Sequence, residues 1–448
     1  MSEAINKVIT RFPPSPTGYL HIGRVRTALF NYLFAKSQGG ELVLRIEDTD
    51  KDRSKPEYEK DIMEGLEWLG ISYDNKSVPR QSERSEIYKK FIQKLIDKDL
   101  AFISKEENPK LKSGKEGREE VVRFKNPNIK VKFTDLIRGE VEFDTTDLGD
   151  FVVAKSLDEP IYHLTVVIDD NEMGITHVIR GEDHISNTPR QILIQEALGF
   201  DRPTYAHLPL ILGSDKSKLS GRHGAVSLND YKKDYLPEAI VNYLALLGWN
   251  PGDEREIFTM PELIKEFSIE KVQKSGAIFS TEKLDWINKK HLDKLSDEDF
   301  LVRIGEYISD ELKNYKNFEK VLPLLRERVS KFSDAKTLID DGEFSFYIND
   351  PEVFAEKLVW KNDGKEKAVE NLTQVISLLG NVEDFSFESV KSAVQQFADD
   401  VGKGSVMHPM RLALTGRDRS PDPFTVAGIL GKETTIKRLN KAVKALLE

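Results

Sequence analysis

Cysteine is absent from the 448 residues of this sequence, which excludes disulfides, thiolate nucleophiles and zinc sites with cysteine ligands. No run approaches the roughly 18 consecutive apolar residues that a membrane-spanning helix needs. The opening residues MSEAINKVITRF also lack the charged start and apolar core of a secretory signal. From these absences we expect a cytoplasmic protein with no membrane partner and no zinc.

Basic residues are outnumbered by acidic ones, because the sequence has 66 Lys and Arg and 76 Asp and Glu, which gives a net charge of −10. A nucleic-acid partner requires cations that face phosphate, so this balance argues weakly against one. Net charge says little about one face of a large protein, however, and an RNA enzyme and a metabolite enzyme both stay open. The length exceeds a single core and predicts about two to four domains.

The amino-terminal third alternates between strand and helix patterns. Apolar spacing and turn residues predict, in order, a strand at 8–12, a Pro/Gly-rich turn at 13–18, a helix through 25–33, a strand at 41–47 and helices near 56–69 and 83–99. This order is typical of a doubly wound α/β domain.

The pattern changes after residue 101. A charged segment at 105–120 predicts a mobile loop, and the surrounding patterns predict short strands at 121–125, 129–133, 140–143 and 151–155. The α/β character returns at 161–168 and 175–180, with a helix at 188–198 and a strand at 207–212. Beyond about residue 227, helical periodicity covers 236–247, 260–267, 280–290, 298–314, 321–332, 365–379, 387–397 and 434–447.

We therefore expect a Rossmann-type doubly wound domain with a small α+β insertion, followed by an all-α carboxy-terminal half. The expected divisions are the first half of the Rossmann domain at 1–100, the insertion at 101–160, the second half at 161–226, a helical domain at 227–315 and an all-helical domain at 316–448.

The string RFPPSPTGYLHIG at 11–23 ends a strand and opens a helix. Its prolines and first glycine fix a tight turn, and the helix after it offers free N–H groups and a positive dipole end to a phosphate. His21 would donate to that phosphate, and Gly23 would let a nucleotide approach the backbone. A lone HxG is more often an incidental turn, but the adjoining SPTG favours a nucleotide site.

A second string, KLSGR at 218–222, lies within GSDKSKLSGRHGAVS after a predicted strand. Its glycines predict a mobile loop, and Lys216, Lys218, Arg222 and His223 make that loop cationic. Such a loop can close over a triphosphate and stabilise charge that grows in a transition state. Taken alone, a solvated surface loop is the commoner interpretation.

Together the two strings resemble the HIGH and KMSKS signatures of class I aminoacyl-tRNA synthetases in order and placement. Further strings are similar to those of the glutamyl-tRNA synthetases: RIEDTD at 45–50, LIRGEVEFD at 136–144, HVIRGEDHISNTPRQ at 177–191, KSGAIFSTEKLDWIN at 274–288 and HPMRLALTGR at 408–417. The resemblance implies an enzyme that uses ATP with Mg²⁺ to form glutamyl-adenylate, with L-glutamate and tRNA(Glu) as partners, acting as a monomer. It implies acceptor-end, stem and anticodon contacts by 101–160, 227–315 and 316–448.

A glutamate site should supply two cations for the carboxylates and one anion for the ammonium. Arg11 and Arg180 each end a predicted strand on the face where such folds bind ligands, and their planar forks suit carboxylates. Glu47 is the candidate ammonium partner, and Tyr162 and Ser15 can share hydrogen bonds. The resemblance assigns Arg11 to the side-chain carboxylate and Arg180 to the α-carboxylate, with the reverse pairing left open; surface ion pairs are the alternative for each.

The remaining roles follow from the resemblance alone. The catalytic residues that it implies are His21, Gly23, Lys218, Ser220 and Arg222. The ATP-binding residues that it implies are Ser15, Thr17, Gly18, His21, Gly23, Glu182, Lys218 and Gly221. No protein-held metal site is expected. Basic side chains expected to serve the anticodon arm are Arg326, Arg328, Arg411 and Arg417.

Three departures from the family pattern bear on function. Many bacterial relatives carry Gly where this chain has Arg24, and Gly221 replaces the lysine usual in KLSKR. Lys216 or Arg222 can substitute for that lysine by a swing of the glycine-flanked loop. The insertion cannot hold the Cys/His zinc site often found there, because the chain has no cysteine.

Four alternatives are weighed against a glutamyl-specific enzyme, and the sequence disfavours the first and the third. A glutaminyl-tRNA synthetase typically has EPNG where this chain has SPTG, and a β-barrel anticodon module where this chain is helical. A relative that also charges tRNA(Gln) cannot be distinguished by sequence. The enzyme that glutamylates queuosine lacks an anticodon-binding half, whereas residues 316–448 are present. The last alternative is an RNA- or nucleotide-binding protein whose activation chemistry is weakened by Gly221.

Overall fold

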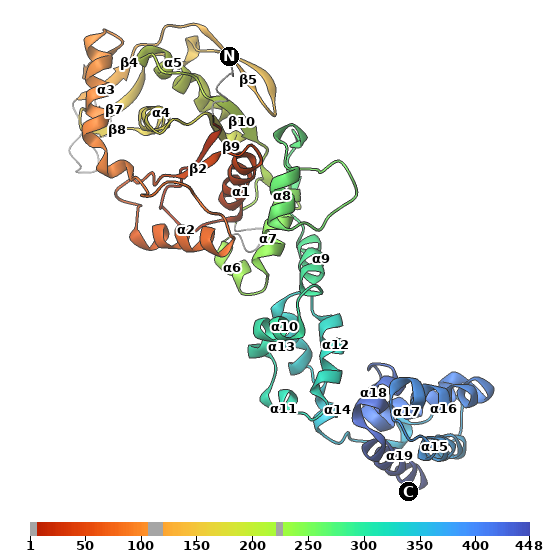
Figure 1. Ribbon diagram of the computed structural model, residues 1–448. Coiled ribbons are helices and arrows are strands. Elements are labelled where there is room, and N and C mark those ends of the chain that lie inside the picture. Colours follow the sequence, from red (N-terminus) through yellow and green to blue (C-terminus); the bar gives the residue numbers. More distant parts are fainter. Residues whose placement is uncertain (1–6, 106–119, 221–226) are drawn as a thin grey trace. The chain divides into compact units, whose positions relative to one another are not determined.

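The structure is a computed structural model that describes residues 7–105, 120–220 and 227–448 (Figure 1). The chain divides into two compact units, Met1–His291 and Leu292–Glu448, which are described separately. Residues 292–315 thus group with the carboxy-terminal unit, whereas the sequence places a boundary at 315/316. The mobile loop predicted at 105–120 falls almost entirely outside the described residues. No helix of the described ranges is both long and apolar enough to cross a membrane.

The centre of the amino-terminal unit is a parallel sheet. Strand β1 (Ile9–Phe12) pairs in parallel with β2 (Glu41–Leu44), and β9 (His177–Gly181) pairs in parallel with β10 (Thr204–Leu208). The amide of Thr176, just before β9, donates to the carbonyl of Ile9 at 2.9 Å, so β1 lies beside β9. The chain therefore leaves β1 toward β2 on one side and later returns to β9 on the other, which is a topological switch point.

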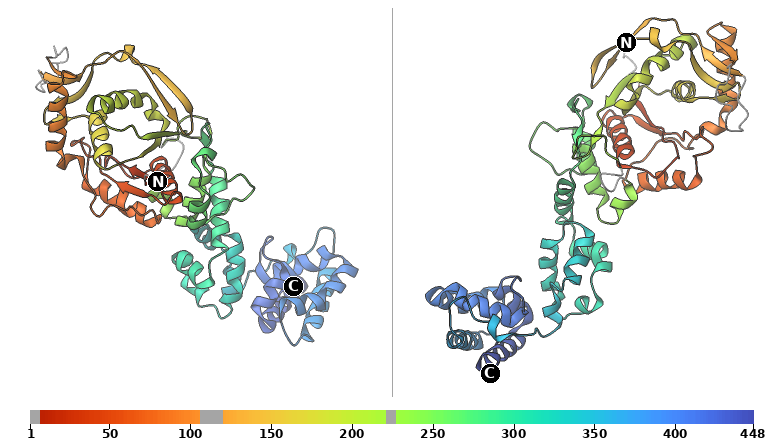
Figure 2. Two further views of the ribbon diagram at one scale, coloured as in Figure 1. Left: turned by 45° about the horizontal axis from the view of Figure 1, so that its top comes forward. Right: turned by 180° about the vertical axis from the view of Figure 1, so that it is seen from behind.

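Helix α1 (Ile22–Ser37) connects β1 to β2 and lies against the parallel strands (Figure 2). Its cap is His21, whose backbone is extended and whose ring accepts a hydrogen bond from the Arg24 amide. Nearly all sides of the helix are buried, as expected for a helix that is apolar all round. The strand, turn and helix predicted from residues 8–33 are confirmed.

The segment 101–160 forms two sets of antiparallel strands. Strands β3 (Ala101–Lys105), β4 (Glu120–Phe124), β7 (Phe151–Ser156) and β8 (Glu159–Pro160) make one sheet. The hairpin of β5 (Lys130–Asp135) and β6 (Gly139–Asp144) joins the parallel sheet instead, because β5 pairs with β10 through Asp135 and Tyr205. The four short strands predicted here are present, and β3 and β8 are additions.

One hydrophobic core joins this segment to its surroundings. It combines Tyr88 of α3 (Ser85–Asp97), Phe133 of β5, Val153 of β7 and Ile168 of α4 (Tyr162–Glu172). Helix α5 (Thr188–Leu198) adds its apolar residues to the same core. Segment 101–160 therefore shares its core with the main sheet, and this fixes the site elements α4 and β9 against it.

The rest of the amino-terminal unit is mostly helical. Its elements are α2 (Pro56–Trp68), α6 (Leu228–Lys232), α7 (Pro237–Leu246), α8 (Met260–Glu266) and α9 (Thr281–Leu292), with the short parallel pair β11 (Ile211–Leu212) and β12 (Ala277–Ile278). A capping box between Thr259 and Glu262 begins α8.

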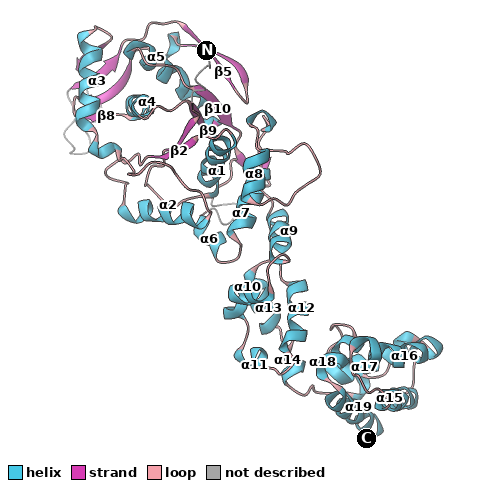
Figure 3. Cartoon of the chain, in the orientation of Figure 1, coloured by secondary structure: helices cyan, strands magenta, loops and turns pink. Residues whose placement is uncertain are grey.

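The carboxy-terminal unit, described over its whole length, consists of helices and loops without strands (Figure 3). Its α-helices are α10 (Asp297–Ile304), α11 (Asp310–Lys313), α12 (Phe318–Arg328), α13 (Phe332–Asp340), α14 (Ser345–Ile348), α15 (Lys365–Gly380), α16 (Phe387–Val401), α17 (Lys403–Thr415), α18 (Pro423–Leu430) and α19 (Lys432–Leu447). The predicted α/β domain followed by an all-α half is confirmed.

Two helices predicted in this unit are wrong in extent. The single helix expected at 298–314 is broken, because Ser309 caps a new helix by accepting the Leu312 amide. The helix expected at 321–332 ends at Arg328, and α13 begins at Phe332. Helices α13, α14, α17 and α18 were not predicted. Cap residues, which periodicity ignores, explain the break at Ser309.

Candidate active site

The predicted glutamate-binding residues come together at the carboxyl edge of the parallel sheet. Arg11 and Arg180 lie near the ends of the neighbouring strands β1 and β9, and Glu47 follows β2. Tyr162 begins α4, and its phenol is within electrostatic reach of both arginines and of Glu47. The side chains of Arg11, Glu47 and Arg180 are almost fully buried. Three charged side chains and one phenol thus come together beside the switch point.

Two carboxylates absent from the predicted site organise these charges. Asp170 accepts hydrogen bonds from Nη1 of Arg45 at 2.9 Å and from Nε of Arg11 at 3.3 Å. Arg45 also donates to Oε1 of Glu47 at 3.0 Å. Asp169, fully buried next to Asp170, accepts from three further donors, which are Nε2 of Gln81, Nε of Arg84 and the hydroxyl of Tyr88. Arg11 is therefore part of a buried ion network.

The network sets the protonation of its members. Burial alone would lower the pKa of Arg45, but the carboxylates of Asp170 and Glu47 outweigh it and hold that pKa above its ordinary value. Burial raises the pKa of Glu47, and Arg45 opposes this shift. Removing one partner from such a network leaves an uncompensated buried charge, which costs about 3–5 kcal/mol. The network thus fixes the orientation of Glu47 and Arg11.

Arg180 differs from Arg11 in having an unsatisfied nitrogen. Its Nη2 donates to Oγ1 of Thr188 at 2.8 Å, and its Nε donates to Nε2 of His207 at 3.2 Å. Its Nη1 is buried and has no hydrogen-bond partner within the described ranges. Leaving a buried charged donor unpaired costs on the order of 1–3 kcal/mol. A carboxylate from a ligand would remove that cost.

His207 holds Arg180 in place and depends on Asp135. Because Nε2 of His207 accepts from Arg180, its proton must be on Nδ1, which donates to Oδ2 of Asp135 at 2.6 Å. Burial lowers the pKa of His207, so the ring is neutral near pH 7. Burial would raise the pKa of Asp135, but the hydrogen bonds from His207 and the Arg138 amide lower it. Asp135, His207 and Arg180 therefore form a fixed chain of hydrogen bonds.

Tyr162 and His184 complete this side of the pocket. The Tyr162 hydroxyl lies 3.2 Å from Nδ1 of His184. Burial raises the pKa of Tyr162, and burial followed by the charge of Arg180 lowers the pKa of His184 to about 4. Both groups are therefore neutral hydrogen-bonding partners at pH 7.

The HIG string lies at the start of α1 and has room beside it. His21 is an exposed residue, yet desolvation, with the charges of Arg24 and Lys218, lowers its pKa to about 4, so it is a neutral donor at pH 7. A Cβ on Gly23 would approach the His21 ring to 3.2 Å, whereas a Cβ on Gly18 would enter open space. A side chain at position 23 would thus crowd the His21 ring, and Gly18 borders space that a nucleotide can occupy.

Lys218 of the KLSGR string lies close enough to His21 for its charge to lower the pKa of that histidine. Lys218 pairs with Leu212 as a β-bridge, and its Nζ lies 2.9 Å from Oδ2 of Asp183. Ser227 forms a second β-bridge with His21. The two predicted motifs are therefore adjacent in space. Gly221 and Arg222 lie outside the described residues.

The other predicted residues occupy the rim of this region. The carbonyl of Ser15 accepts from Arg24, and the Thr17 amide donates to the same carbonyl. Ser220 is exposed. Oε1 of Glu182 accepts the amide of Leu210 at 2.8 Å, and its other oxygen pairs with Arg138. Glu182 therefore ties β9 to the segment after β10.

Sequence reasoning missed Asp169, Asp170, Asp135 and His207. The first two offered a signal, because adjacent carboxylates at the end of the apolar run LTVVI are unusual for a buried helix. Asp135 and His207 are 72 residues apart and offered none.

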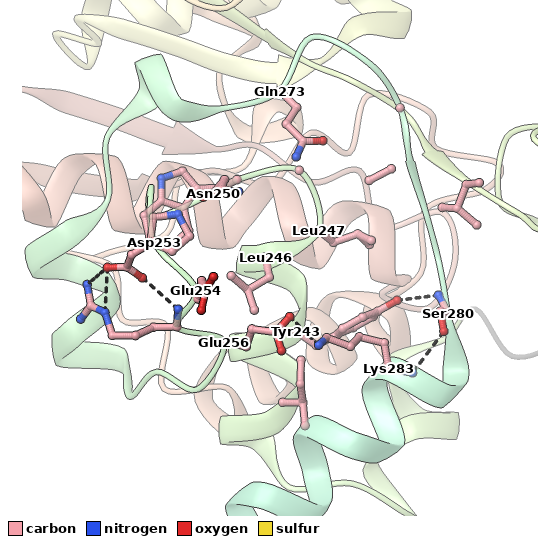
Figure 4. A pocket seen from close by; sticks show the side chains of 18 residues that line it. Tyr243, Leu246, Leu247, Asn250, Asp253, Glu254, Glu256, Gln273, Ser280 and Lys283 are labelled. Carbon is pink, nitrogen blue, oxygen red and sulfur yellow. Dashed lines mark hydrogen bonds and ion pairs between the residues drawn. The ribbon is translucent and has the colours of Figure 1, made fainter.

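A cavity of about 810 Å³ lies elsewhere in the amino-terminal unit and contains none of the predicted site residues (Figure 4). Its charged groups pair with one another, as Lys283 does with Glu256 at 2.6 Å and Arg255 with Asp253 at 2.7 Å. We therefore do not assign it to the reaction. The described residues also contain no group of three or more His, Asp or Glu placed to hold a metal ion.

Comparison with protein families identifies both halves of the chain. Residues 7–120 and 104–286 match the catalytic domain of class I tRNA synthetases (E and Q). Residues 292–443 match an anticodon binding domain. The second match begins where the carboxy-terminal compact unit begins.

Individual relatives match over almost the whole length. The chain is 41% identical to glutamate–tRNA ligase 1 of Caldanaerobacter subterraneus subsp. tengcongensis, covering 99% of each sequence. It is also 41% identical to the glutamate–tRNA ligase of Aquifex aeolicus, covering 99% of this chain and 100% of the other. A crystal structure of a glutamate tRNA ligase from Elizabethkingia meningosepticum, in complex with its amino acid, superposes with a TM-score of 0.83 at 35% identity and covers 98% of this chain and 100% of that one. This chain belongs to the glutamate–tRNA ligase family of class I aminoacyl-tRNA synthetases.

Proposed function

We propose that this protein joins L-glutamate to the 3′ end of tRNA(Glu) in two steps, through a glutamyl-adenylate. The observation that carries the proposal is the pair of strand-end guanidinium groups, of which Arg180 presents a buried Nη1 without a partner among the described residues. Glutamate supplies two carboxylates and one ammonium. Arg11, Arg180 and Glu47 supply the complementary set of charges.

Each pocket residue has a defined task in this proposal. Arg180 and Arg11 each receive one carboxylate, the α-carboxylate and the side-chain carboxylate respectively, or the reverse. Glu47, held by Arg45 at 3.0 Å, receives the ammonium. The Tyr162 hydroxyl adds a neutral hydrogen bond. Glutamine lacks the second carboxylate, so it forgoes one charge-assisted hydrogen bond to a buried arginine, a loss of about 1–3 kcal/mol.

The phosphates of ATP belong at the start of α1. A helix N-terminus binds anions through free N–H groups, and His21 adds a neutral donor. Lys218, whose ion pair with Asp183 is exposed, is free to exchange that carboxylate for the departing pyrophosphate. Mg²⁺ enters with ATP, since it is bound mainly through substrate phosphates and water. No covalent nucleophile is needed, because the α-carboxylate of glutamate is itself the nucleophile.

The carboxy-terminal unit is the proposed anticodon-binding part, as its family match implies. Not all of its arginines are available for RNA, however. Arg326 donates to the carbonyls of Leu292 and Leu295 and lies over the ring of Phe300. We infer that Arg326 stabilises the fold, because these hydrogen bonds connect α12 to the first residues of the unit.

ATP–pyrophosphate exchange with glutamate, with and without tRNA, tests this function. Glutamate-dependent exchange in either condition supports activation of glutamate. A protein that binds ATP and tRNA but gives no exchange would instead be a synthetase-derived binding protein. The expected monomeric state is checked separately by light scattering.

A further inference from the structure

Arg24 places a cation at the start of α1, where the helix dipole disfavours positive charge. It is the third residue of α1, whose first turn contains no acidic residue. The N-terminus of a helix carries a partial positive charge, so a cation there is disfavoured by about 0.3–1 kcal/mol. An anion bound beside Arg24 would offset this cost.

No carboxylate of the described ranges forms an ion pair with Arg24, although the charge of Glu47 acts on it. One Arg24 nitrogen, Nη1, donates to the carbonyl of Ser15 at 2.9 Å, and no described carboxylate is within ion-pairing distance. Burial lowers the pKa of Arg24, and Glu47 only partly offsets this shift. Arg26, two residues later, is different, because its guanidinium donates to the carbonyls of Leu247 and Pro209. Arg26 is thus committed to the fold, whereas Arg24 retains donors for a ligand.

The surroundings of Arg24 indicate which ligand. On one side is Ser15, a predicted glutamate- and ATP-binding residue whose carbonyl accepts from Nη1 of Arg24 at 2.9 Å, and the charge of Glu47 also acts on the guanidinium. On the other side is His21, whose pKa is lowered by both Arg24 and Lys218 after desolvation. Arg24 therefore stands between the amino-acid part of the site and the part formed by the two nucleotide motifs.

The α-phosphate of ATP is the group at which the two substrates react, so it belongs where the two parts of the site meet. In the first step an oxygen of the glutamate α-carboxylate forms a bond to the α-phosphorus of ATP. The bond from that phosphorus to the bridging oxygen breaks, and pyrophosphate leaves with the electron pair. A guanidinium beside the non-bridging oxygens would stabilise the charge that they carry in this transition state.

We propose that Arg24 donates hydrogen bonds to a non-bridging oxygen of the α-phosphate and accelerates adenylate formation. This assignment rests on the proposed function of the site. It adds a cation to the phosphate contacts proposed for His21 and Lys218.

The test begins with single-turnover formation of glutamyl-adenylate at saturating ATP, with and without tRNA. Arg24→Met removes the charge but keeps the length of the side chain, and we expect a rate loss on the order of 10–100-fold with little change in the KM for ATP. Arg24→Lys should keep part of the rate. Lys36→Met removes a charge from the last turn of the same helix and serves as the matched control, with no expected loss.

Phosphorothioate ATP separates contact with phosphate from a role in shaping the Ser15 turn. Sulfur in place of one non-bridging α-oxygen should slow adenylate formation by the wild-type protein. For one diastereomer, the ratio of the rate with ATP to the rate with the thio analogue should fall toward one in Arg24→Met. If Arg24 only shapes the turn, ATP and both thio analogues will slow equally in the variant, and the unchanged ratios would overturn the assignment. A wild-type protein that forms no adenylate from ATP would instead overturn the proposed function.

Discussion

Replacing Asp170 by asparagine tests the buried ion network under the pocket. Asp170 is almost fully buried and accepts from two charged donors, at 2.9 Å from Arg45 and 3.3 Å from Arg11. Asparagine keeps one acceptor oxygen and loses the charge. One charge-assisted hydrogen bond is worth about 1.5–3 kcal/mol. Arg11 also loses the carboxylate that pairs with it, whereas Arg45 keeps Glu47. Because Arg11 is buried, we expect the free energy of unfolding to fall by about 3–5 kcal/mol.

The measurement is urea unfolding followed by tryptophan fluorescence. Trp68, Trp249 and Trp286 report on the amino-terminal unit, whereas Trp360 belongs to the other. Asp158→Asn is the matched control, because that carboxylate pairs with Lys89 at an exposed site. An exposed pair contributes about 0–1 kcal/mol, so the control should differ little from the wild type.

The same variant should also raise the KM for glutamate, since Arg11 loses one of the contacts that orient it. The network would be refuted as the support of the pocket by a variant that loses less than about 1 kcal/mol and binds glutamate normally. Loss of stability with an unchanged KM would mean that the network stabilises the fold but does not position Arg11.

Four further outcomes are expected. Arg11→Ala should leave the protein folded, since Asp170 keeps Arg45, and should abolish glutamate activation; a near-normal KM for glutamate would contradict the assignment. Burial lowers the pKa of His163 and His184 to about 4, whereas unfolded histidine titrates near 6.5, so the unfolded chain binds more protons between these values. The free energy of unfolding should therefore fall as pH drops from about 6.5 to 4, and pH-independent unfolding would rule out this effect. Gly221→Lys should raise the single-turnover rate of adenylate formation if a phosphate contact is missing, by lowering the activation free energy by about 1–3 kcal/mol. An unchanged rate would show that another cation already makes that contact. Elemental analysis should find no stoichiometric zinc in purified protein, and one zinc per chain would require a site without cysteine.

Local signals explain why part of the fold and site could be predicted. The turn before His21 and the helix that starts there are signalled by neighbouring residues, namely prolines, a glycine and a capping side chain. Arg11 and Arg180 could be placed at strand ends because the strands are short apolar runs. Such features need only a few neighbours in sequence, so one chain suffices to find them.

The missing parts depend on residues far apart in the sequence. Arg45 meets Asp170 across 125 positions, and His207 meets Asp135 across 72. Periodicity describes which face of an element is buried, but it does not say which buried charges will meet. The break before Ser309 was missed for a different reason, because a cap interrupts a pattern whose apolar spacing continues.

Attachment of glutamate and of glutamine to tRNA(Glu), measured side by side as kcat/KM, tests the central claim most directly. A pocket with two carboxylate-binding arginines predicts transfer of glutamate, with glutamine disfavoured by the loss of one charge-assisted hydrogen bond, or about 5–150-fold. Comparable kcat/KM values for the two amino acids, or a preference for glutamine, would contradict the account.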